Sequence, residues 1–471
     1  MGMSKSNPLS APASPVGEVI AALTPHFGER LSTAPAVREQ HGHDESWHET
    51  APPDAVVFPQ STEEVARIVR TCAAHRVPVI PFGAGTSLEG HVAAIHGGIA
   101  IDMSRMTALK RVSPEDLDCT VEAGITRKQL NAQLRDTGLF MPVDPGADAS
   151  IGGMVSTRAS GTNAVRYGTI RENVLGLTVV LADGTVAHTG GRARKSAAGY
   201  DLTHLLIGAE GTLGVVTEVT LRLHGIPEEI GAATCSFAGV DQAVATVIET
   251  IQSGIPVARI ELLDDVMVRA CNAHSGLSLP EQPMLFLEFH GTAAGVAEQS
   301  DRVAALAEAN GGSGFAWSTR PEDRSRLWEA RHNAYYAALA LEPGKKGFTT
   351  DVCVPVSRLA DVIAATRADI AATSLTAPLV GHVGDGNFHL ILLVDPEDEA
   401  NMAEAMAAHD RLVTRALDAG GTCTGEHGIG LGKQHYLARE HGDALGAMRA
   451  VKQALDPHDI MNPGKMLPPA G

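Results

Sequence analysis

The stretch Pro81-Phe82-Gly83-Ala84-Gly85-Thr86-Ser87-Leu88-Glu89-Gly90 follows a run of β-forming residues and supplies several small residues in succession. Glycine lets successive backbone N–H groups point into one concavity, which suits the oxygen atoms of a phosphate group. The stretch matches neither GxGxxG nor GxxxxGK[ST], so the common nucleotide-binding fingerprints do not apply. Taken alone, it is as consistent with a tight structural turn as with a phosphate site.

Four later segments of similar composition favour the second interpretation. They are rich in glycine and other small residues, and they lie at 144–148, 151–154, 159–168 and 208–214. Five such loops within about 130 residues exceed what chain reversals require. Together they predict a backbone that wraps around a long cofactor containing a pyrophosphate.

The hydrophobic pattern around these loops predicts two kinds of fold. A strand at 55–59, a helix starting at Ser61 and a strand at 77–81 form a β-α-β unit that leads into the first loop. From about 230 to 425, short strands alternate with helices, which indicates an α+β domain with an antiparallel sheet. A last continuous helix is predicted over 434–455. Residues 1–16, rich in Ser, Pro and Ala, are predicted to be disordered, and an irregular segment follows them.

A second informative stretch is Gly381-His382-Val383-Gly384-Asp385-Gly386-Asn387-Phe388-His389. Asp-Gly between extended segments predicts a two-residue type I′ turn. His382 and His389 would then be directly opposed across the hairpin, with Cβ atoms roughly 5 Å apart. Two imidazoles at that distance can bind one divalent metal ion.

Glu426, within Gly425-Glu426-His427-Gly428, is a third candidate ligand. A single buried histidine is more often structural, but the His-His-Glu set favours a functional site. Three protein ligands leave room for a substrate, as catalytic zinc requires, and manganese or iron would also accept this set. Adjacent side chains seldom reach one ion together. His427 therefore remains free to act as a base, with an unperturbed pKa near 6.5.

The helical run from Trp328 to Tyr336 supplies candidates for substrate binding. The planar guanidinium of Arg331 matches the two oxygens of a carboxylate, although an ion pair within the helix is equally consistent with the pattern. Tyr335 lies on the same run. Asn387 is predicted to share the hairpin face of His389 and to hydrogen-bond the substrate.

The glycine loops, in this order, resemble the FAD-binding domain of the vanillyl-alcohol-oxidase/PCMH flavoprotein superfamily. Four further segments resemble its D-2-hydroxyacid dehydrogenase branch, and most closely the cytochrome-type D-lactate dehydrogenases; they lie at 330–334, 350–355, 381–389 and 424–428. The resemblance extends from about residue 50 to residue 467. It implies an α+β protein in which a PCMH-type FAD-binding domain of two subdomains is followed by a substrate (cap) domain with an antiparallel sheet.

The resemblance also implies four segments. They are a tail and lead-in at 1–50, the FAD-binding domain at 51–228, the cap domain with the metal site at 229–425, and a C-terminal segment at 426–471 that packs back on the FAD-binding domain.

Residue roles follow from the same resemblance. FAD would bind non-covalently, with the loop 83–87 at the pyrophosphate. His91, the nearby candidate for covalent attachment, is the less favoured alternative. The predicted cofactor-binding residues are Pro81, Gly83, Ala84, Gly85, Thr86, Ser87, Leu88, Gly90, Pro145, Gly146, Asp148, Ala149, Gly152, Gly153, Ala159, Ser160, Gly161, Asn163, Tyr167, Gly168, Glu210, Gly211, Gly214, Val216 and Asn462. The metal, with zinc favoured, would be bound by His382, His389 and Glu426, while Arg331 would bind the carboxylate.

The implied reaction is oxidation of a small D-2-hydroxy acid. D-lactate would become pyruvate as hydride moves to flavin N5 and His427 takes the hydroxyl proton. The hydroxyglutarate enzymes of this branch have a lysine where this chain has Thr349, which favours a substrate with one carboxylate. Lys345 and Lys346 lie close enough in sequence to leave that choice open. The alternative substrates are glycolate or a longer 2-hydroxy acid, with the chain as one subunit of a glycolate-oxidase-like complex.

Composition limits the remaining possibilities. The net charge of −18 and the absence of a Lys/Arg run argue against a nucleic-acid partner. Six scattered cysteines without a CxxC pair suggest reduced thiols in the cytoplasm. No apolar run reaches the ~20 residues of a membrane span, although peripheral association with a membrane stays open. A cytochrome or quinone acceptor and a homodimer are expected. A metal-dependent hydrolase and a non-catalytic nucleotide-binding subunit are the rival functions.

Overall fold

The computed structural model describes residues 14–469, and the disorder predicted for residues 1–13 lies outside this range. Residues 14–16 belong to the start of a helix, α1 (Pro15–Phe27), so the predicted tail is wrong there. Ser14 caps this helix, and Val19, Leu23 and Phe27 are buried at helical spacing. The segment that follows is not irregular either. It contains η1 (Gly28–Arg30), β1 (Leu31–Ser32) and α2 (Pro35–Gln40).

A four-stranded sheet leads the chain into the first glycine loop. In it β2 (Ala55–Val57) and β3 (Val79–Phe82) run parallel to β4 (Ile99–Asp102), and the strand order is β1-β2-β4-β3. The predicted β-α-β unit is therefore confirmed, with α3 (Thr62–His75) between β2 and β3. The Ser61 hydroxyl caps α3 by accepting from the Glu64 N–H at 3.3 Å. The loop starts directly after β3.

A five-stranded antiparallel sheet with the order β5-β6-β10-β8-β9 lies beside the first sheet. Its strands are β5 (Leu109–Ser113), β6 (Asp118–Glu122), β8 (Val174–Val180), β9 (Val186–Gly190) and β10 (Val215–Arg222). The short elements around it are η2 (Met103–Arg105), α4 (Arg127–Leu134), η3 (Arg135–Thr137), β7 (Leu139–Phe140), α5 (Ile151–Thr157), α6 (Ala164–Tyr167), α7 (Ile170–Asn173), α8 (Leu202–Leu206) and β11 (His224–Gly225). The glycine-rich segments 144–148, 159–168 and 208–214 lie largely between these elements. The segment 151–154, predicted as a loop, is instead the first turn of α5, because Ser150 caps a helix there.

The second half of the chain forms an eight-stranded sheet with the order β15-β12-β14-β13-β18-β19-β16, and β17 pairs with β19 off this path. The strands are β12 (Glu229–Ser236), β13 (Val257–Leu263), β14 (Met284–Gly291), β15 (Ser313–Ser318), β16 (Lys346–Thr349), β17 (Val352–Cys353), β18 (Leu379–His382) and β19 (Asn387–Val394). All the pairings recorded in it are antiparallel, as the sequence predicts.

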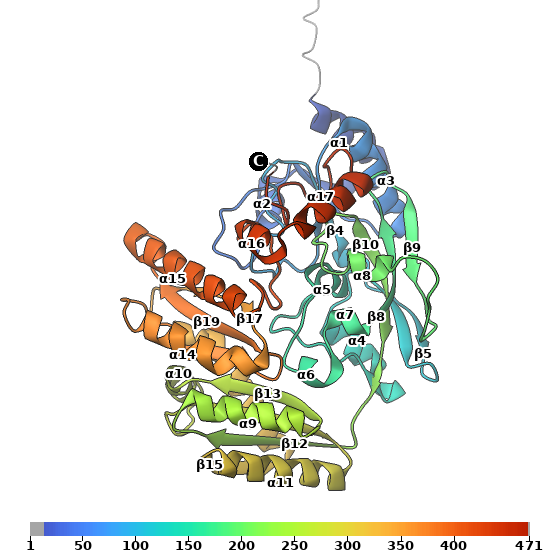
Figure 1. The fold of residues 1–471 in the computed structure, drawn as a ribbon. Helices are drawn as coiled ribbons and strands as arrows, with labels where there is room; N and C mark the ends of the chain where they lie inside the picture. The colour runs from blue at the N-terminus through green and yellow to red at the C-terminus, as the bar shows by residue number, and fades with distance from the viewer. Residues whose placement is uncertain (1–13, 470–471) are drawn as a thin grey trace, which may run out of the picture.

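Helices cover both faces of the large sheet (Figure 1). One face is packed by α9 (Val240–Gln252), α11 (Ala293–Ala309), α14 (Leu359–Ile370) and α15 (Glu399–Asp418). The other is packed by α10 (Asp265–Ser275), α12 (Pro321–His332) and α13 (Ala334–Leu339). The helical run predicted from Trp328 to Tyr336 is divided at Asn333 into the end of α12 and the start of α13.

The hairpin of β18 and β19 differs from the prediction. Its connection is the four-residue segment 383–386, and positive φ occurs at Gly386 but not at Asp385, so no type I′ turn forms. His382 therefore pairs with Asn387, and His389 pairs with Val380. This register is two residues away from the predicted one. Because side chains alternate with period two, His382 and His389 still share one face.

The C-terminal segment is also different from the prediction. In place of one helix it forms η5 (Gln434–Tyr436), α16 (Leu437–His441) and α17 (Ala444–Leu455), interrupted at Gly442 with φ +52°. It packs on both halves of the molecule. Tyr436 and Leu437 lie in the core of the large sheet, whereas Ile460 and Met461 lie in the core of the two N-terminal sheets. In Figure 1 the red helices α16 and α17 lie close to the blue N-terminal region.

Candidate active site

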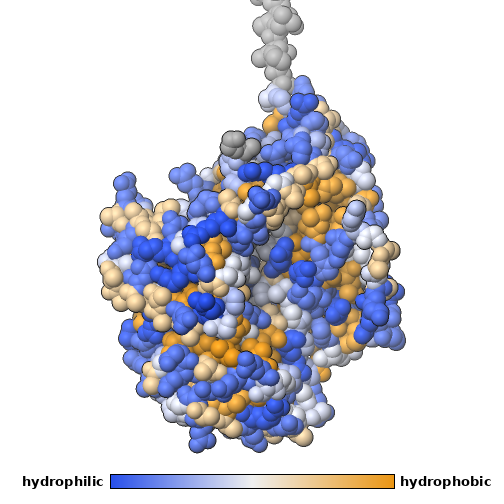
Figure 2. All heavy atoms as spheres, in the orientation of Figure 1, coloured by the Kyte–Doolittle hydropathy of each residue, from blue (hydrophilic) through white to orange (hydrophobic). Residues whose placement is uncertain are grey.

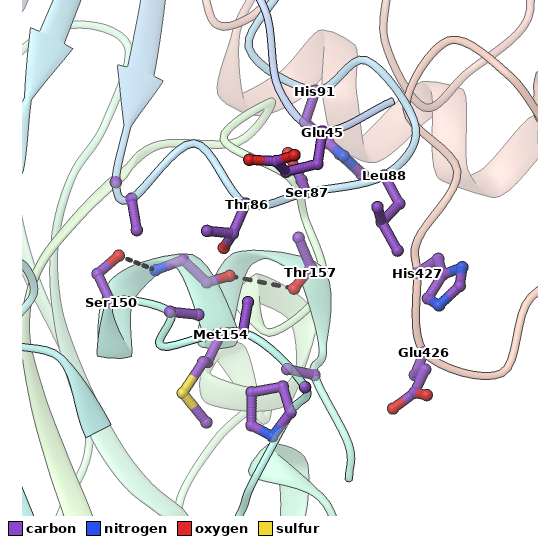
Figure 3. Close-up of a pocket in the computed structure, with 18 of the residues that line it drawn as sticks. Glu45, Thr86, Ser87, Leu88, His91, Ser150, Met154, Thr157, Glu426 and His427 are labelled. Atoms are coloured by element: carbon purple, nitrogen blue, oxygen red, sulfur yellow. Dashed lines mark hydrogen bonds between the residues drawn. The ribbon is translucent and has the colours of Figure 1, made fainter. Parts of the chain in front are cut away.

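One cavity of about 610 Å³ brings the glycine loops and the histidine motifs together. The loop after β3, the first turns of α5 and the loop before β10 line one side. The other side is lined by residues of α12, α13, β16, β18, β19 and the loop 426–427. The molecular surface is hollowed where the two halves meet (Figure 2). In Figure 3, His427 and Glu426 lie across the cavity from Thr86, Ser87 and Met154.

The loop after β3 is built to receive an anion. Within residues 14–469, the backbone N–H groups of Ala84 to Leu88 donate no hydrogen bond. Backbone donors away from water require acceptors, so five consecutive free amides along a cavity wall favour a phosphate-bearing ligand. A side chain at Gly83 would collide with the Ser150 hydroxyl, which caps α5 by accepting from Gly153 at 3.3 Å (Figure 3). The loop can therefore approach α5 only without a Cβ atom.

Most of the predicted cofactor-binding residues line this cavity. Those that do are Pro81, Gly83, Ala84, Gly85, Thr86, Ser87, Leu88, Pro145, Gly146, Ala149, Gly152, Gly153, Ala159, Ser160, Gly161, Glu210, Gly211, Val216 and Asn462. Those that lie outside its lining are Gly90, Asp148, Asn163, Tyr167, Gly168 and Gly214.

Asn163 and Tyr167 instead contact the second half of the chain. The Asn163 side-chain oxygen accepts from Arg259 at 3.0 Å, and the Tyr167 hydroxyl hydrogen-bonds His290 at 2.7 Å. Arg259 also pairs with Asp144 at 3.1 Å. These glycine-rich segments therefore join the two halves of the molecule as well as lining the cavity.

The three predicted metal ligands converge. One oxygen of Glu426 lies 3.1 Å from His382 Nε2 and 3.2 Å from His389 Nε2. The Nδ1 atoms of both rings already have acceptors, because His382 bonds Glu261 at 2.8 Å and His389 bonds the Thr350 carbonyl at 3.0 Å. When Nδ1 carries the proton, Nε2 has a free lone pair. This is the arrangement that a metal-binding histidine needs, so the residues fit a divalent cation.

The charges of this cluster are strongly coupled. Burial alone would lower the pKa of His382, but the carboxylates of Glu261 and Glu426 outweigh it and raise that pKa well above the usual value. Burial would raise the pKa of Glu426, but His382 and His389 outweigh it and lower that pKa. The Glu426 carboxylate is therefore ionised between two imidazole rings. A negative charge shared by two imidazole nitrogens is a donor set that suits a divalent cation.

Asp351 positions the loop that carries Glu426 and His427. Its Oδ2 accepts the N–H groups of Gly425, Glu426 and His427 at 2.8, 3.0 and 3.0 Å. Oδ2 also accepts the Thr424 hydroxyl at 2.6 Å. Burial would raise the pKa of Asp351, but His427, Lys433 and His389 hold it well below its usual value. The ionised carboxylate therefore fixes three consecutive backbone groups.

His427 is held at the cavity wall with its ring stacked on His389, the two ring centres being 5.0 Å apart. Burial lowers the pKa of His427 to about 4; Asp351 opposes this shift, while His389 and Lys433 add to it. The unperturbed value near 6.5 predicted from sequence is therefore not retained. The imidazole is neutral at neutral pH, which is the form that accepts a proton.

Arg331 lines the cavity and forms an ion pair, though not within its own helix. Its Nε and Nη2 donate to one oxygen of Glu261 on β13 at 3.0 and 2.5 Å. Burial would raise the pKa of Glu261, but His382 and Arg331 outweigh it and lower that pKa. The Nη1 group donates no hydrogen bond within the described part of the chain, so one edge of the guanidinium is open to a ligand.

Of the other two predicted substrate-binding residues, Tyr335 lines the cavity and Asn387 does not. Tyr335 lines the cavity, with its ring against Gly347 of β16. Asn387 does not line it, because its amide donates to Asp351 at 2.7 Å and to the Val352 carbonyl at 2.8 Å. Glu261 and Asp351 are absent from the predicted site. Asp351 lies in a segment that carries the family resemblance, whereas nothing local marks Glu261.

Comparisons with known proteins agree with this arrangement. Residues 53–190 match the family model "FAD binding domain", and residues 226–466 match "FAD linked oxidases, C-terminal domain". The fold also resembles the solved structure of p-cresol methylhydroxylase with substrate bound, with a TM-score of 0.77 over 97% of this chain and 98% of that one. At 16% identity, this likeness shows the fold alone.

Several relatives are similar over nearly the whole chain. A probable mitochondrial D-lactate dehydrogenase of Danio rerio is 53% identical over 98% of this chain and 94% of its own length. A mitochondrial D-lactate dehydrogenase [cytochrome] of Arabidopsis thaliana is 48% identical over 96% and 80%. A glycolate oxidase subunit of Bacillus subtilis is 33% identical over 93% and 94%.

Fold and cavity together define a flavoprotein with a PCMH-type FAD-binding domain and a second α+β domain, and the predicted fold class is confirmed. The chain belongs to the FAD-linked oxidase family.

Proposed function

We propose that this protein is an FAD-dependent dehydrogenase that oxidises D-lactate to pyruvate and passes the electrons to an acceptor other than NAD. The observation that supports this best is the single cavity in which the free amides of the glycine loop face Arg331 and His427. The two relatives named D-lactate dehydrogenase are more similar to this chain than the glycolate oxidase subunit is. Glycolate, or a longer 2-hydroxy acid, is therefore the second candidate substrate.

Arg331, Glu261 and His427 have separate roles in the proposed reaction. The open edge of the Arg331 guanidinium binds the substrate carboxylate, and its ion pair with Glu261 holds it in place. Neutral His427 accepts the proton of the 2-hydroxyl group. FAD, held by the loop 83–88, would supply the acceptor for the hydride from C2, so that two electrons and two hydrogens leave the substrate.

We also propose a divalent metal ion at His382, His389 and Glu426. The support is the pair of Nδ1 contacts, to Glu261 and to the Thr350 carbonyl, which direct both Nε2 lone pairs toward the Glu426 carboxylate. Held by these three side chains, such an ion would supply a Lewis acid for the hydroxyl group of the substrate. Zinc is favoured because it accepts three nitrogen and oxygen ligands with one position open, and manganese or iron are the alternatives.

The charge of the cavity favours a substrate with one carboxylate. Among the described residues that line it, Arg331 is the one lysine or arginine. Lys345 pairs with Glu342 at 2.7 Å. Lys346 is exposed and lies opposite Val394, on the face of the sheet away from the cavity. Thr349 is opposite Ile391 and lines the cavity. A second carboxylate would therefore find no lysine or arginine besides Arg331.

A cytochrome is the proposed electron acceptor, since the Arabidopsis relative is named as a cytochrome-linked enzyme. Among the described residues, no helix is both long and apolar enough to cross a lipid bilayer. A homodimer, peripheral membrane association and a cytoplasmic location remain predictions from the sequence.

A visible absorption spectrum of the purified protein, recorded anaerobically before and after adding D-lactate, tests the proposal. We expect flavin bands that bleach with D-lactate and not with L-lactate. Faster bleaching by glycolate would favour the second candidate. A colourless protein that FAD cannot reconstitute would contradict the proposed function, and hydrolysis without an electron acceptor would point to the metal-dependent hydrolase.

A further inference from the structure

Glu261 is a fully buried carboxylate at the junction of two functional groups. It lies on β13, next to β18, and its two oxygens face different partners. Oε1 bonds His382 Nδ1 at 2.8 Å, and Oε2 accepts both Nε and Nη2 of Arg331. One side chain therefore contacts a proposed metal ligand and the proposed carboxylate-binding residue.

The two contacts have different chemical consequences. A carboxylate only accepts hydrogen bonds, so the contact with Oε1 places a proton on His382 Nδ1, and in the neutral imidazole the free lone pair is then on Nε2. The contact with Glu261 Oε2 uses the Nε and Nη2 edge of the Arg331 guanidinium and leaves its other edge free. Because the carboxylate is rigid and planar, it also sets the distance between the imidazole and the guanidinium.

We propose that Glu261 is a positioning residue that holds His382 in its metal-binding tautomer and Arg331 in its substrate-binding orientation. The inference rests on the proposed function, because it assigns Glu261 to the same metal and carboxylate sites. It adds that the two sites are coupled through one side chain. A single amide substitution should therefore weaken metal binding and substrate binding together.

Glu261→Gln tests this directly. The amide of glutamine has one acceptor oxygen and one donor NH2 group, so it cannot accept from both partners. If the NH2 group faces His382, it requires Nδ1 to be the acceptor and moves the ring proton to Nε2. If it faces Arg331, it opposes a guanidinium that only donates. We expect zinc affinity to fall about 10- to 100-fold, and KM for D-lactate to rise together with a loss of kcat.

The neighbouring strand offers a matched control. Glu288 on β14 is also buried and bonds one histidine and one arginine, His290 at 2.7 Å and Arg259 at 3.4 Å. Neither partner belongs to the proposed metal set. Glu288→Gln removes an equivalent buried charge, and we expect it to leave zinc affinity and KM within about twofold of the wild type.

The measurement is zinc binding by the flavin-loaded protein, followed by competition with a chromogenic chelator. It is combined with steady-state kinetics and with flavin content as a check on folding. Wild-type zinc affinity and KM in Glu261→Gln would overturn the inference. A wild-type protein that is reduced by D-lactate but binds no zinc would overturn it too, while leaving the dehydrogenase function intact.

If Glu261→Gln does not fold, Glu261→Asp gives the same test. The shorter side chain keeps the charge but cannot span both partners, so we expect weaker zinc binding or a higher KM. Unchanged values for both would overturn the inference.

Discussion

His427 is the residue on which the proposed chemistry depends most. Its ring stacks on His389, and desolvation at its half-buried position lowers its pKa to about 4. The neutral imidazole can accept a proton but does not carry a positive charge at neutral pH. Because the hydroxyl proton needs an acceptor close to the substrate, the proposed reaction depends on this ring.

We therefore expect His427→Asn to lower kcat for D-lactate by about 10²- to 10⁴-fold, the usual contribution of a general base. Stopped-flow measurement of flavin bleaching checks this. Flavin content should stay normal, because the cofactor loops do not depend on the imidazole. His435→Asn is a suitable control, since His435 lies on the same segment with its side chain 62% exposed. Equal bleaching rates in both variants would remove His427 from the mechanism.

At the level of elements, the hairpin of β18 and β19 places the two histidines. Gly386 has φ +81°, and a Cβ atom there would collide with the carbonyl of Val354. That carbonyl directly follows β17, and Asp351 directly precedes this strand. Gly386 therefore serves both a left-handed turn and a close approach of two backbones.

Gly386→Ala should destabilise the protein by about 2–3 kcal/mol, because the backbone strain of a left-handed alanine adds to the collision of its Cβ atom with the Val354 carbonyl. Gly276→Ala is the matched control. Gly276 has φ +62°, but a Cβ atom there would have no neighbour within 4 Å. Gly276→Ala should therefore lower the free energy of unfolding only through backbone strain, by about 1–2 kcal/mol. Denaturant unfolding followed by flavin fluorescence compares the two. Equal losses would mean that the contact with Val354 relaxes freely.

At the level of the whole molecule, buried charges join the two halves. Arg259 of β13 pairs with Asp144 at 3.1 Å and with Glu288 at 3.4 Å, and its guanidinium lies 4.6 Å from the centre of the Trp328 ring. Asp144 belongs to a glycine-rich loop of the first half. The loop carrying His427 is also fixed from both sides, by Asp351 and by Glu210, which accepts the N–H groups of Ile429 and Gly430.

Arg259→Met should leave Asp144 and Glu288 buried without their cation and cost about 3–5 kcal/mol of stability. Urea unfolding measures this loss. Arg302→Met is the control, because Arg302 is exposed and lies 3.9 Å from Glu298. Arg302→Met should change the free energy of unfolding by no more than about 0.5 kcal/mol. A similar small loss for Arg259→Met would show that the two halves are held together by their apolar contacts instead.

Local sequence patterns were sufficient to predict several elements of this protein. The β-α-β unit before the first loop and the antiparallel second sheet follow from short segments of sequence. The proximity of His382, His389 and Glu426 was predicted in the same way, while their role as metal ligands stays a prediction. Strand alternation explains why the histidines share a face although the predicted register is wrong by two residues. The helix breaks at Asn333 and Gly442 differ from the prediction, because periodicity continues across single residues that end a helix.

Contacts between distant segments were decided by the tertiary structure alone. Glu261 meets His382 across 121 residues of sequence, and Asp351 meets the His427 backbone across 76. A buried carboxylate is stable only where folding brings it enough donors, and no local pattern encodes those partners. The sequence by itself therefore determined which side chains are the candidates for the chemistry. The packing of two sheets around one cavity decided which buried charges hold those side chains in place.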